Sequence, residues 1–127
     1  MMKRVAQKLS RRSRLPLAGL YRAATGARAP LPRFLVVGNG RSGTGSLYRT
    51  LVRHPRIAAP YTKELNFFTT HFFLGTRWYR AMLDRDRTRA DTPPITFEAT
   101  PSYFWRPHVA GRIARLLARH QTCAAPA

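Results

Sequence analysis

A short, continuous apolar run opens the central part of the chain. Residues 34–37 read Phe-Leu-Val-Val; Pro30 and Pro32 precede them and Gly38 follows. Such a run between Pro and Gly is typical of a buried strand in a parallel sheet. The Gly-rich segment 38–45 comes next, and we expect it to form a loop.

Three later segments have the apolar spacing of helices. The first, residues 46–53, should end near His54, because Pro55 disfavours helical geometry in the residue before it. Residues 76–83 form the second, whose aromatic side chains we expect in the core, and residues 109–117 lie on the third. The apolar positions are Leu47, Tyr48, Leu51 and Val52 in the first, Trp78, Tyr79, Met82 and Leu83 in the second, and Val109, Ile113, Leu116 and Leu117 in the third.

Two further apolar segments are strand candidates, residues 57–60 and residues 95–98. The charged segment 84–94 between them ends in Pro-Pro and is predicted to be a loop. Together with residues 34–37, these segments make the chain alternate strand and helix three times. This order is typical of an α/β fold with a parallel sheet and flanking helices.

The charge of the chain is strongly positive. Its 127 residues include 23 Lys and Arg against 5 Asp and Glu, a formal charge of +18. Such a field attracts anions of any kind, including nucleic acid, anionic lipid and phosphorylated small molecules. Residues 1–33 carry basic side chains and no acid. We predict a flexible, solvated basic arm there, with membrane-surface or nucleic-acid contact as alternatives.

The sequence contains no apolar run that approaches the ~18 residues needed to span a bilayer. Residues 15–20 are too short and broken for the core of a signal peptide. We therefore predict a soluble, cytoplasmic protein without a transmembrane segment. Cys123 is the single cysteine, which excludes an intrachain disulfide and a cysteine-rich metal site, and no metal cofactor is expected.

The Gly-rich segment has the pattern of an anion-binding loop. A loop that leaves a strand and enters a helix directs backbone N–H groups and the positive end of the helix dipole at one spot. Gly38 and Gly43 have the separation found in nucleotide-triphosphatase loops, but Thr44-Gly45 replaces the Lys and Ser or Thr expected next. Nucleotide hydrolysis is therefore disfavoured.

A dinucleotide-binding fingerprint is a second interpretation of the same loop. Residues 38–43 satisfy G-x-G-x-x-G, and Glu64 lies near the spacing of a ribose-binding acid. That acid should end an apolar strand, whereas residues 59–63 (Ala-Pro-Tyr-Thr-Lys) are a poor strand end. A Rossmann-type oxidoreductase stays open as an alternative, as does a basic nucleic-acid-binding protein.

Three motifs together resemble the opening of the sulfotransferases that use phosphoadenosine phosphosulfate (PAPS). The likeness is greatest to the branch that includes the heparan sulfate enzymes and many bacterial relatives, and it covers residues 34 to about 119. The motifs occur in the family's order and at similar spacing, which favours this interpretation. They are residues 34–48 (Phe-Leu-Val-Val-Gly-Asn-Gly-Arg-Ser-Gly-Thr-Gly-Ser-Leu-Tyr) with Leu51 and His54-Pro55, then Lys63-Glu64-Leu65-Asn66-Phe67-Phe68, and finally Phe97-Glu98-Ala99-Thr100-Pro101-Ser102-Tyr103-Phe104.

The resemblance implies a P-loop-like α/β domain that transfers a sulfuryl group from PAPS to a hydroxyl or an amine. In the family pattern Glu64 matches the catalytic base. Arg41 matches a position that is commonly lysine and acts on the leaving phosphate; arginine keeps the charge there but does not donate a proton. The implied acceptor is a small molecule or a carbohydrate, and no specific nucleic acid is expected. The implied PAPS-binding residues are Arg41, Ser42, Gly43, Thr44, Gly45 and Ser46.

The chain departs from the family pattern in two places. Ala99 stands where the family often has a lysine that orients acceptor and base, and we expect His71 and His108 to be structural or solvated. The family also continues past the third helix into a strand and an Arg-Asp-Pro stretch, whose Arg binds the 3′-phosphate together with a later Ser. We therefore expect residues 34–120 to be a partial sulfotransferase domain, truncated after the third helix and followed by a disordered tail at 121–127. Weak PAPS binding should result.

Overall fold

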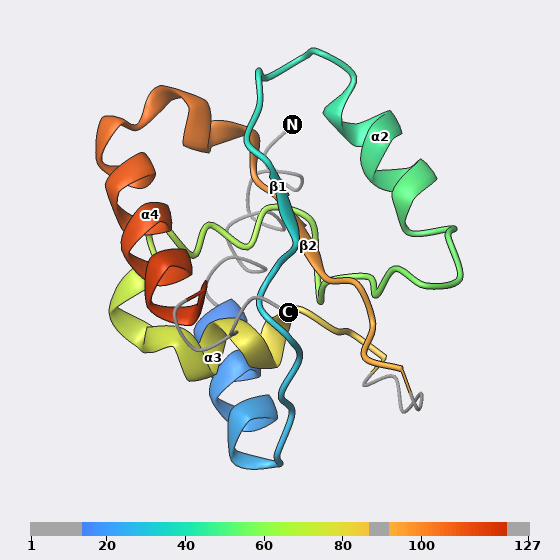
Figure 1. Cartoon of the computed structure of the whole chain (residues 1–127), viewed down its shortest axis with the longest axis vertical. Helices are drawn as coiled ribbons and strands as arrows, with labels where there is room; N and C mark the ends of the chain where they lie inside the picture. Colours follow the sequence, from blue (N-terminus) through green and yellow to red (C-terminus); the bar gives the residue numbers. More distant parts are fainter. Residues whose placement is uncertain (1–13, 87–91, 122–127) are drawn as a thin grey trace.

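The computed structural model describes residues 14–86 and 92–121. Figure 1 shows two short strands side by side with helices around them. The elements are a helical segment at residues 14–24, β1 (Phe34–Val36), α2 (Thr44–Leu51), the 3-10 turn η1 (Phe72–Leu74), α3 (Gly75–Met82), β2 (Phe97–Ala99), the 3-10 turn η2 (Pro101–Trp105) and α4 (Pro107–Gln121). Of the tail predicted to be disordered at residues 121–127, Gln121 is the last residue of α4. Residues 122–127, which include Cys123, and part of the predicted loop 84–94 lie outside the described residues.

The two strands pair in parallel, with Phe34 opposite Phe97 and Val36 opposite Ala99. They confirm the first and third predicted strands, although β2 begins two residues later than predicted. Parallel pairing places the carboxyl ends of both strands at one edge of the sheet. Thr100 N–H, just past β2, extends the ladder by donating to the carbonyl of Val36 at 3.0 Å.

The strand predicted at residues 57–60 is wrong in extent. Ile57 forms only an isolated parallel bridge with Ile95. The chain then turns away from the sheet, since Pro60 has no N–H to donate and the next residue, Tyr61, donates to the carbonyl of Met82 at the end of α3.

Side chains of β2 contact helices on both faces of the sheet. Successive side chains of a strand point to opposite faces. Phe97 stacks on Phe34 and contacts the ring of Tyr48 in α2, whereas Glu98 accepts a hydrogen bond from Tyr79 in α3. In the view of Figure 1, α2 accordingly lies on one side of the strands and α3 and α4 on the other. The architecture is mixed α/β with a small parallel sheet.

The main core lies on the α3 side of the sheet. Phe67 stacks on Tyr79 with ring centroids 4.0 Å apart and also on Trp78. The predicted second helix is confirmed as α3, and its four predicted core side chains are buried. The third helix is confirmed as α4, which buries Val109 and Leu116 against this core.

The predicted apolar face of α2 is only partly buried. The helix forms close to the predicted place, but Leu47 is 46% exposed and Leu51 is half-buried. Thr44, in its first turn, is instead the buried residue of α2. Within the described residues, the aromatic contact between α2 and the sheet is that of the Tyr48 ring with the Phe97 ring.

Residues 14–33 pack against the body of the molecule. This packing differs from the flexible arm expected for residues 1–33. Leu15 and Ala29 are buried in the main core. Trp78 Nε1–H donates to the carbonyl of Pro16 at 3.1 Å, and Arg80 Nε–H donates to the carbonyl of Ala29 at 2.7 Å. Two α3 side chains thus bind backbone carbonyls of this segment. Residues 1–13 lie outside the described residues, and a domain boundary at residue 33 stays a prediction.

Candidate functional site

The Gly-rich loop begins where β1 ends and lies against η2. Phe104 N–H donates to the carbonyl of Val37 at 2.9 Å. Gly38 has a φ of 127°, and an added Cβ would lie 2.7 Å from the carbonyl oxygen of Pro101. Other residues rarely adopt this φ, and the atom that they would meet belongs to the backbone, so only glycine fits here. The start of the loop is therefore fixed by the segment that follows β2.

The loop ends at the N-terminus of α2, which no side chain caps. Gly43 precedes the helix in the left-handed conformation, with a φ of 80°, and the first turn has no acidic residue. The first backbone N–H groups of a helix have no partner within it, and together with the helix dipole they attract anions. The N–H groups of Thr44, Gly45 and Ser46 thus form an electropositive end at the close of the loop.

Two arginine side chains belong to this part of the chain. Arg41 is exposed in the turn and has a φ of 62°. Arg49, one helical turn into α2, donates from Nη2 to Ser46 Oγ at 3.3 Å and so lies back over the first turn. Arg49 was not among the site residues predicted from the sequence, although its i,i+3 spacing from Ser46 indicated that the two side chains could meet.

Glu64 lies at the same edge of the sheet as the Gly-rich loop. Its N–H donates to the carbonyl of Ala99, the last residue of β2, at 2.9 Å. Because Ala99 pairs with Val36 at the end of β1, residue 64 is held beside the point where the loop begins. Glu64 itself has a φ of 63°, a left-handed conformation that is uncommon outside glycine and needs support from its surroundings.

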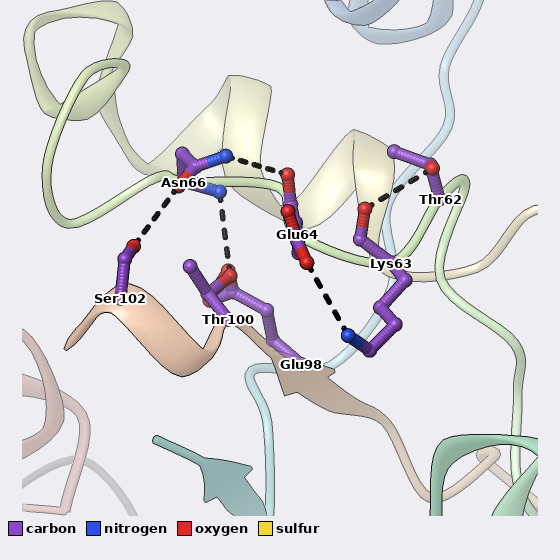
Figure 2. Close-up of polar contacts among 7 residues, drawn as sticks. All are labelled: Thr62, Lys63, Glu64, Asn66, Glu98, Thr100 and Ser102. Atoms are coloured by element: carbon purple, nitrogen blue, oxygen red, sulfur yellow. Dashed lines mark hydrogen bonds and ion pairs between the residues drawn. The ribbon is translucent and has the colours of Figure 1, made fainter. Parts of the chain in front are cut away.

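Asn66 supplies much of that support, as Figure 2 shows. Its Nδ2–H donates to the carbonyl of Glu64 at 2.8 Å, and its Oδ1 accepts from Ser102 Oγ at 3.3 Å. Its own N–H donates to Thr100 Oγ1 at 3.4 Å. Asn66 is also left-handed, with a φ of 53°. The turn at residues 64–66 is thus fastened to the segment that follows β2.

The carboxylate of Glu64 is accessible to a ligand. Lys63 Nζ lies 3.3 Å from Glu64 Oε1, and the two side chains are 27% and 40% exposed. A pair this exposed contributes little to folding, typically less than about 1 kcal/mol. Lys63 immediately precedes the turn, whereas the resemblance implies that a lysine often stands at position 99, where this chain has alanine.

A second carboxylate, Glu98, lies buried directly beneath this turn and was not selected from the sequence. Its Oε1 accepts from the hydroxyl of Tyr79 at 2.7 Å, and its Oε2 accepts from the hydroxyls of Tyr103 at 2.7 Å and Thr100 at 3.1 Å. The available signal was an acid inside an apolar strand, which requires buried partners. Burial raises the pKa of Glu98 to about 7, and its hydrogen bonds partly offset that effect.

His71 and His108 were expected to be structural or solvated. His71 is buried, and its Nδ1 lies 2.9 Å from the carbonyl oxygen of Leu65, a structural contact. His108 is exposed in the first turn of α4. In the part of the chain that the structure describes, no three His, Cys, Asp or Glu side chains gather into a group that could hold a metal ion.

Comparison with known proteins finds sulfotransferases among the relatives of this chain. No family model matches the chain. The membrane-associated sulfotransferase kil1 of Dictyostelium discoideum is 35% identical over 83 residues, 65% of this chain. The matched segment is a relative of sulfotransferases. The bifunctional heparan sulfate N-deacetylase/N-sulfotransferases 4 of mouse and 3 of human are 31% and 33% identical, each over 68% of the chain.

The sulfotransferase relatives are much longer proteins. This chain spans 17% of the length of the Dictyostelium protein and 10% of the mouse and human ones. The predicted cytoplasmic location is contradicted by this comparison, because the Dictyostelium relative is a membrane-associated sulfotransferase. Among the described residues, no helix has the length and apolar character needed to cross a bilayer.

Proposed function

We propose that this chain contributes the donor-binding loop and the catalytic base of a PAPS-dependent sulfotransferase. One observation carries the proposal: the hydrogen bond from Glu64 N–H to the carbonyl of Ala99 brings the matched acid to the sheet edge where the Gly-rich loop opens. The sulfotransferase relatives supply the reaction class. Residues 34–120 are assigned to this domain, with a P-loop-like arrangement of strand, loop and helix.

The loop suits the 5′-phosphate of PAPS. The uncapped N–H groups of Thr44, Gly45 and Ser46 are the kind of donor set that binds phosphate oxygens at a helix N-terminus. Ser42 and Gly43 form the part of the loop that leads the phosphate to these N–H groups. The hydroxyls of Thr44 and Ser46 add two further hydrogen-bond donors. Ser46 already accepts from Arg49, so its own hydroxyl proton is available to an anion.

The transfer needs a base and a cation from this chain. An acceptor oxygen or nitrogen forms a bond to sulfur while the bond from sulfur to the phosphate oxygen breaks, which leaves adenosine 3′,5′-bisphosphate. Glu64 accepts the proton that the acceptor loses, and Arg41 offsets the charge that develops on the leaving phosphate. As in phosphoryl transfer, the protein contributes by positioning groups and neutralising charge.

The acceptor class proposed is a carbohydrate with a free hydroxyl or amine. The names of the mouse and human relatives describe heparan sulfate N-sulfotransferases. An anionic saccharide would also be attracted by a chain of formal charge +18. Glu64 is 40% exposed, which leaves its carboxylate open to an acceptor group.

The proposal is tested by following labelled sulfate from PAPS into a panel of saccharides that carry free hydroxyls or amines, with the whole protein as enzyme. We expect transfer to at least one saccharide, and the variant Arg41→Ala should lower kcat roughly tenfold to a hundredfold, the loss of one charged contact. The control is Arg53→Ala, which removes an equally exposed arginine beyond the other end of α2. No transfer to any acceptor, or binding of a nicotinamide dinucleotide in place of adenosine 3′,5′-bisphosphate, would contradict the proposal.

A further inference from the structure

We propose that the buried carboxylate of Glu98, acting through the hydroxyl of Thr100, fixes the turn that presents Glu64 to the acceptor. Glu98 is thus a positioning residue, and the inference rests on the proposed function of Glu64 as the base. Glu98 and Thr100 are buried, at 0% and 1% exposure. Neither can contact substrate directly, so any effect on transfer must pass through the residues that they bind.

The hydroxyl of Thr100 joins the buried carboxylate to the turn. A threonine hydroxyl has one proton to donate and lone pairs to accept with. Thr100 Oγ1 donates its proton to Glu98 Oε2, 3.1 Å away. The lone pairs are then left for the N–H of Asn66, whose nitrogen is 3.4 Å from the same oxygen. Glu98 therefore sets the direction of the Thr100 hydroxyl and makes it an acceptor for the turn.

The turn depends on such support because two of its residues are left-handed. Glu64 and Asn66 have φ values of 63° and 53°, a region that costs a non-glycine residue free energy and persists only where surrounding contacts hold it. Figure 2 shows Thr100 beneath Asn66, with Asn66 in turn bonded to Glu64. Loss of the Thr100 hydroxyl would leave the N–H of Asn66 without this acceptor. The position of Asn66, two residues after the proposed base Glu64, would then be held less firmly.

Two further hydrogen bonds to Glu98 come from tyrosines of the core. Tyr79 donates to it from α3, and Tyr103 donates to it from η2. Burial and the nearby carboxylate raise the pKa of both tyrosines, so both remain donors at neutral pH. Glu98 also accepts a backbone hydrogen bond from Phe67, and the hydroxyl of Tyr103 accepts from Phe68 N–H at 3.1 Å. The bond from Thr100 leads to the amide of Asn66 itself, whereas the bond from Tyr79 leads to α3. Tyr79 is therefore the partner whose loss separates a positioning role from a structural one.

The experiment compares three variants of the whole protein. Thr100→Val removes the hydroxyl and keeps the volume of the side chain, whereas Thr100→Ser keeps the hydroxyl. Tyr79→Phe removes a hydrogen bond to the same carboxylate on the core side. For each we would measure kcat and KM for PAPS, the thermal midpoint Tm, and the hydrogen-exchange rate of the Asn66 amide.

We expect Thr100→Val to lower kcat by roughly tenfold to a hundredfold, the effect of a small misplacement of a catalytic group. KM for PAPS should not change, because the base acts in the transition state. Thr100→Ser should restore kcat, and Tyr79→Phe should lower Tm while leaving kcat near that of the natural protein. An unchanged kcat in Thr100→Val, or parallel losses of kcat and Tm in Thr100→Val and Tyr79→Phe, would overturn the positioning role.

The exchange rate separates this inference from the proposed function. If the natural protein transfers no sulfate, the function is wrong, and the Asn66 amide still reports on the turn. Faster exchange of that amide in Thr100→Val than in Thr100→Ser would support the link between Thr100 and the turn. Equal exchange rates in the two variants would overturn it, whatever the activity.

Discussion

The side chain of Glu98 has no contact with solvent. It accepts hydrogen bonds from the hydroxyls of Tyr79 in α3, Tyr103 in η2 and Thr100. A backbone hydrogen bond from Phe67 adds to these. Burial disfavours its charged form more strongly than these donors favour it, so its pKa rises from 4.5 to about 7. A group of this kind makes the stability of the fold depend on pH.

The direction of that dependence follows from proton linkage. Between about pH 4.5 and 7 the folded protein keeps a proton on Glu98 that the unfolded chain has lost. Its contribution to stability is therefore fully present below pH 4.5 and disappears as the pH rises through 7. From pH 5 to pH 8, the natural protein should lose roughly 2–3 kcal/mol more free energy of unfolding than Glu98→Gln, which does not titrate. Urea unfolding of both proteins at the two pH values checks this; an equal change in both would contradict it.

At this scale the sequence indicated some site residues and not others. Glu64 and the loop from Arg41 to Ser46 stand in motifs that resemble those of the sulfotransferase family, and that resemblance made them candidates. Glu98 and Asn66 lie in the same motifs, but their chemistry depends on partners up to 36 residues away in the chain, such as Ser102 for Asn66 and Tyr79 for Glu98. Such pairings are set by the packing of the chain and leave no local pattern.

Among the elements, the helical segment at residues 14–24 packs most closely at Gly19. A Cβ added there would overlap the indole of Trp78, the side chain that also donates to the carbonyl of Pro16. Glycine is normally a poor helix residue, so its presence in this helix is explained by the contact with α3. The basic composition of residues 1–33 indicated solvation and gave no sign of this packing, because the contact uses small and apolar side chains.

Two glycine-to-alanine substitutions should have opposite effects on stability. Gly19→Ala should destabilise the protein by roughly 1–3 kcal/mol, because the methyl group displaces the Trp78 ring. Gly111→Ala in α4 meets no atom within 4 Å and should stabilise it by about 0.5–1 kcal/mol, the usual helical preference for alanine. Chemical denaturation of both variants measures the difference. A neutral or stabilising Gly19→Ala would show that the segment does not pack on α3 as described.

The helices were better predicted than the strands, for a physical reason. α3 and α4 bury a continuous stripe, so their apolar spacing alone specifies them. Residues 57–60 have a similar apolar character, yet Pro60 ends their pairing after a single bridge. Whether a short apolar segment joins a sheet depends on neighbours that local spacing does not reveal.

Across the whole molecule, parallel pairing gathers three distant segments at one sheet edge. The Gly-rich loop follows β1, the turn at residues 64–66 binds the end of β2, and η2 packs on Gly38. The order of the motifs predicted an α/β fold and a sulfotransferase resemblance, and the relatives agree with that reaction class. The predicted cytoplasmic location is contradicted by the Dictyostelium relative, which is a membrane-associated sulfotransferase.

The central claim is that Glu64, held over this edge, is the base for sulfate transfer. The most direct test measures kcat and the affinity for adenosine 3′,5′-bisphosphate in the whole protein carrying Glu64→Gln. The control, Asp86→Asn, removes another exposed carboxylate that pairs with its neighbouring cation, Arg85, at 3.5 Å. We predict that Glu64→Gln lowers kcat by roughly a hundredfold or more with unchanged affinity, and that Asp86→Asn has no effect. An unaltered kcat in Glu64→Gln, or an equal loss in Asp86→Asn, would contradict the claim.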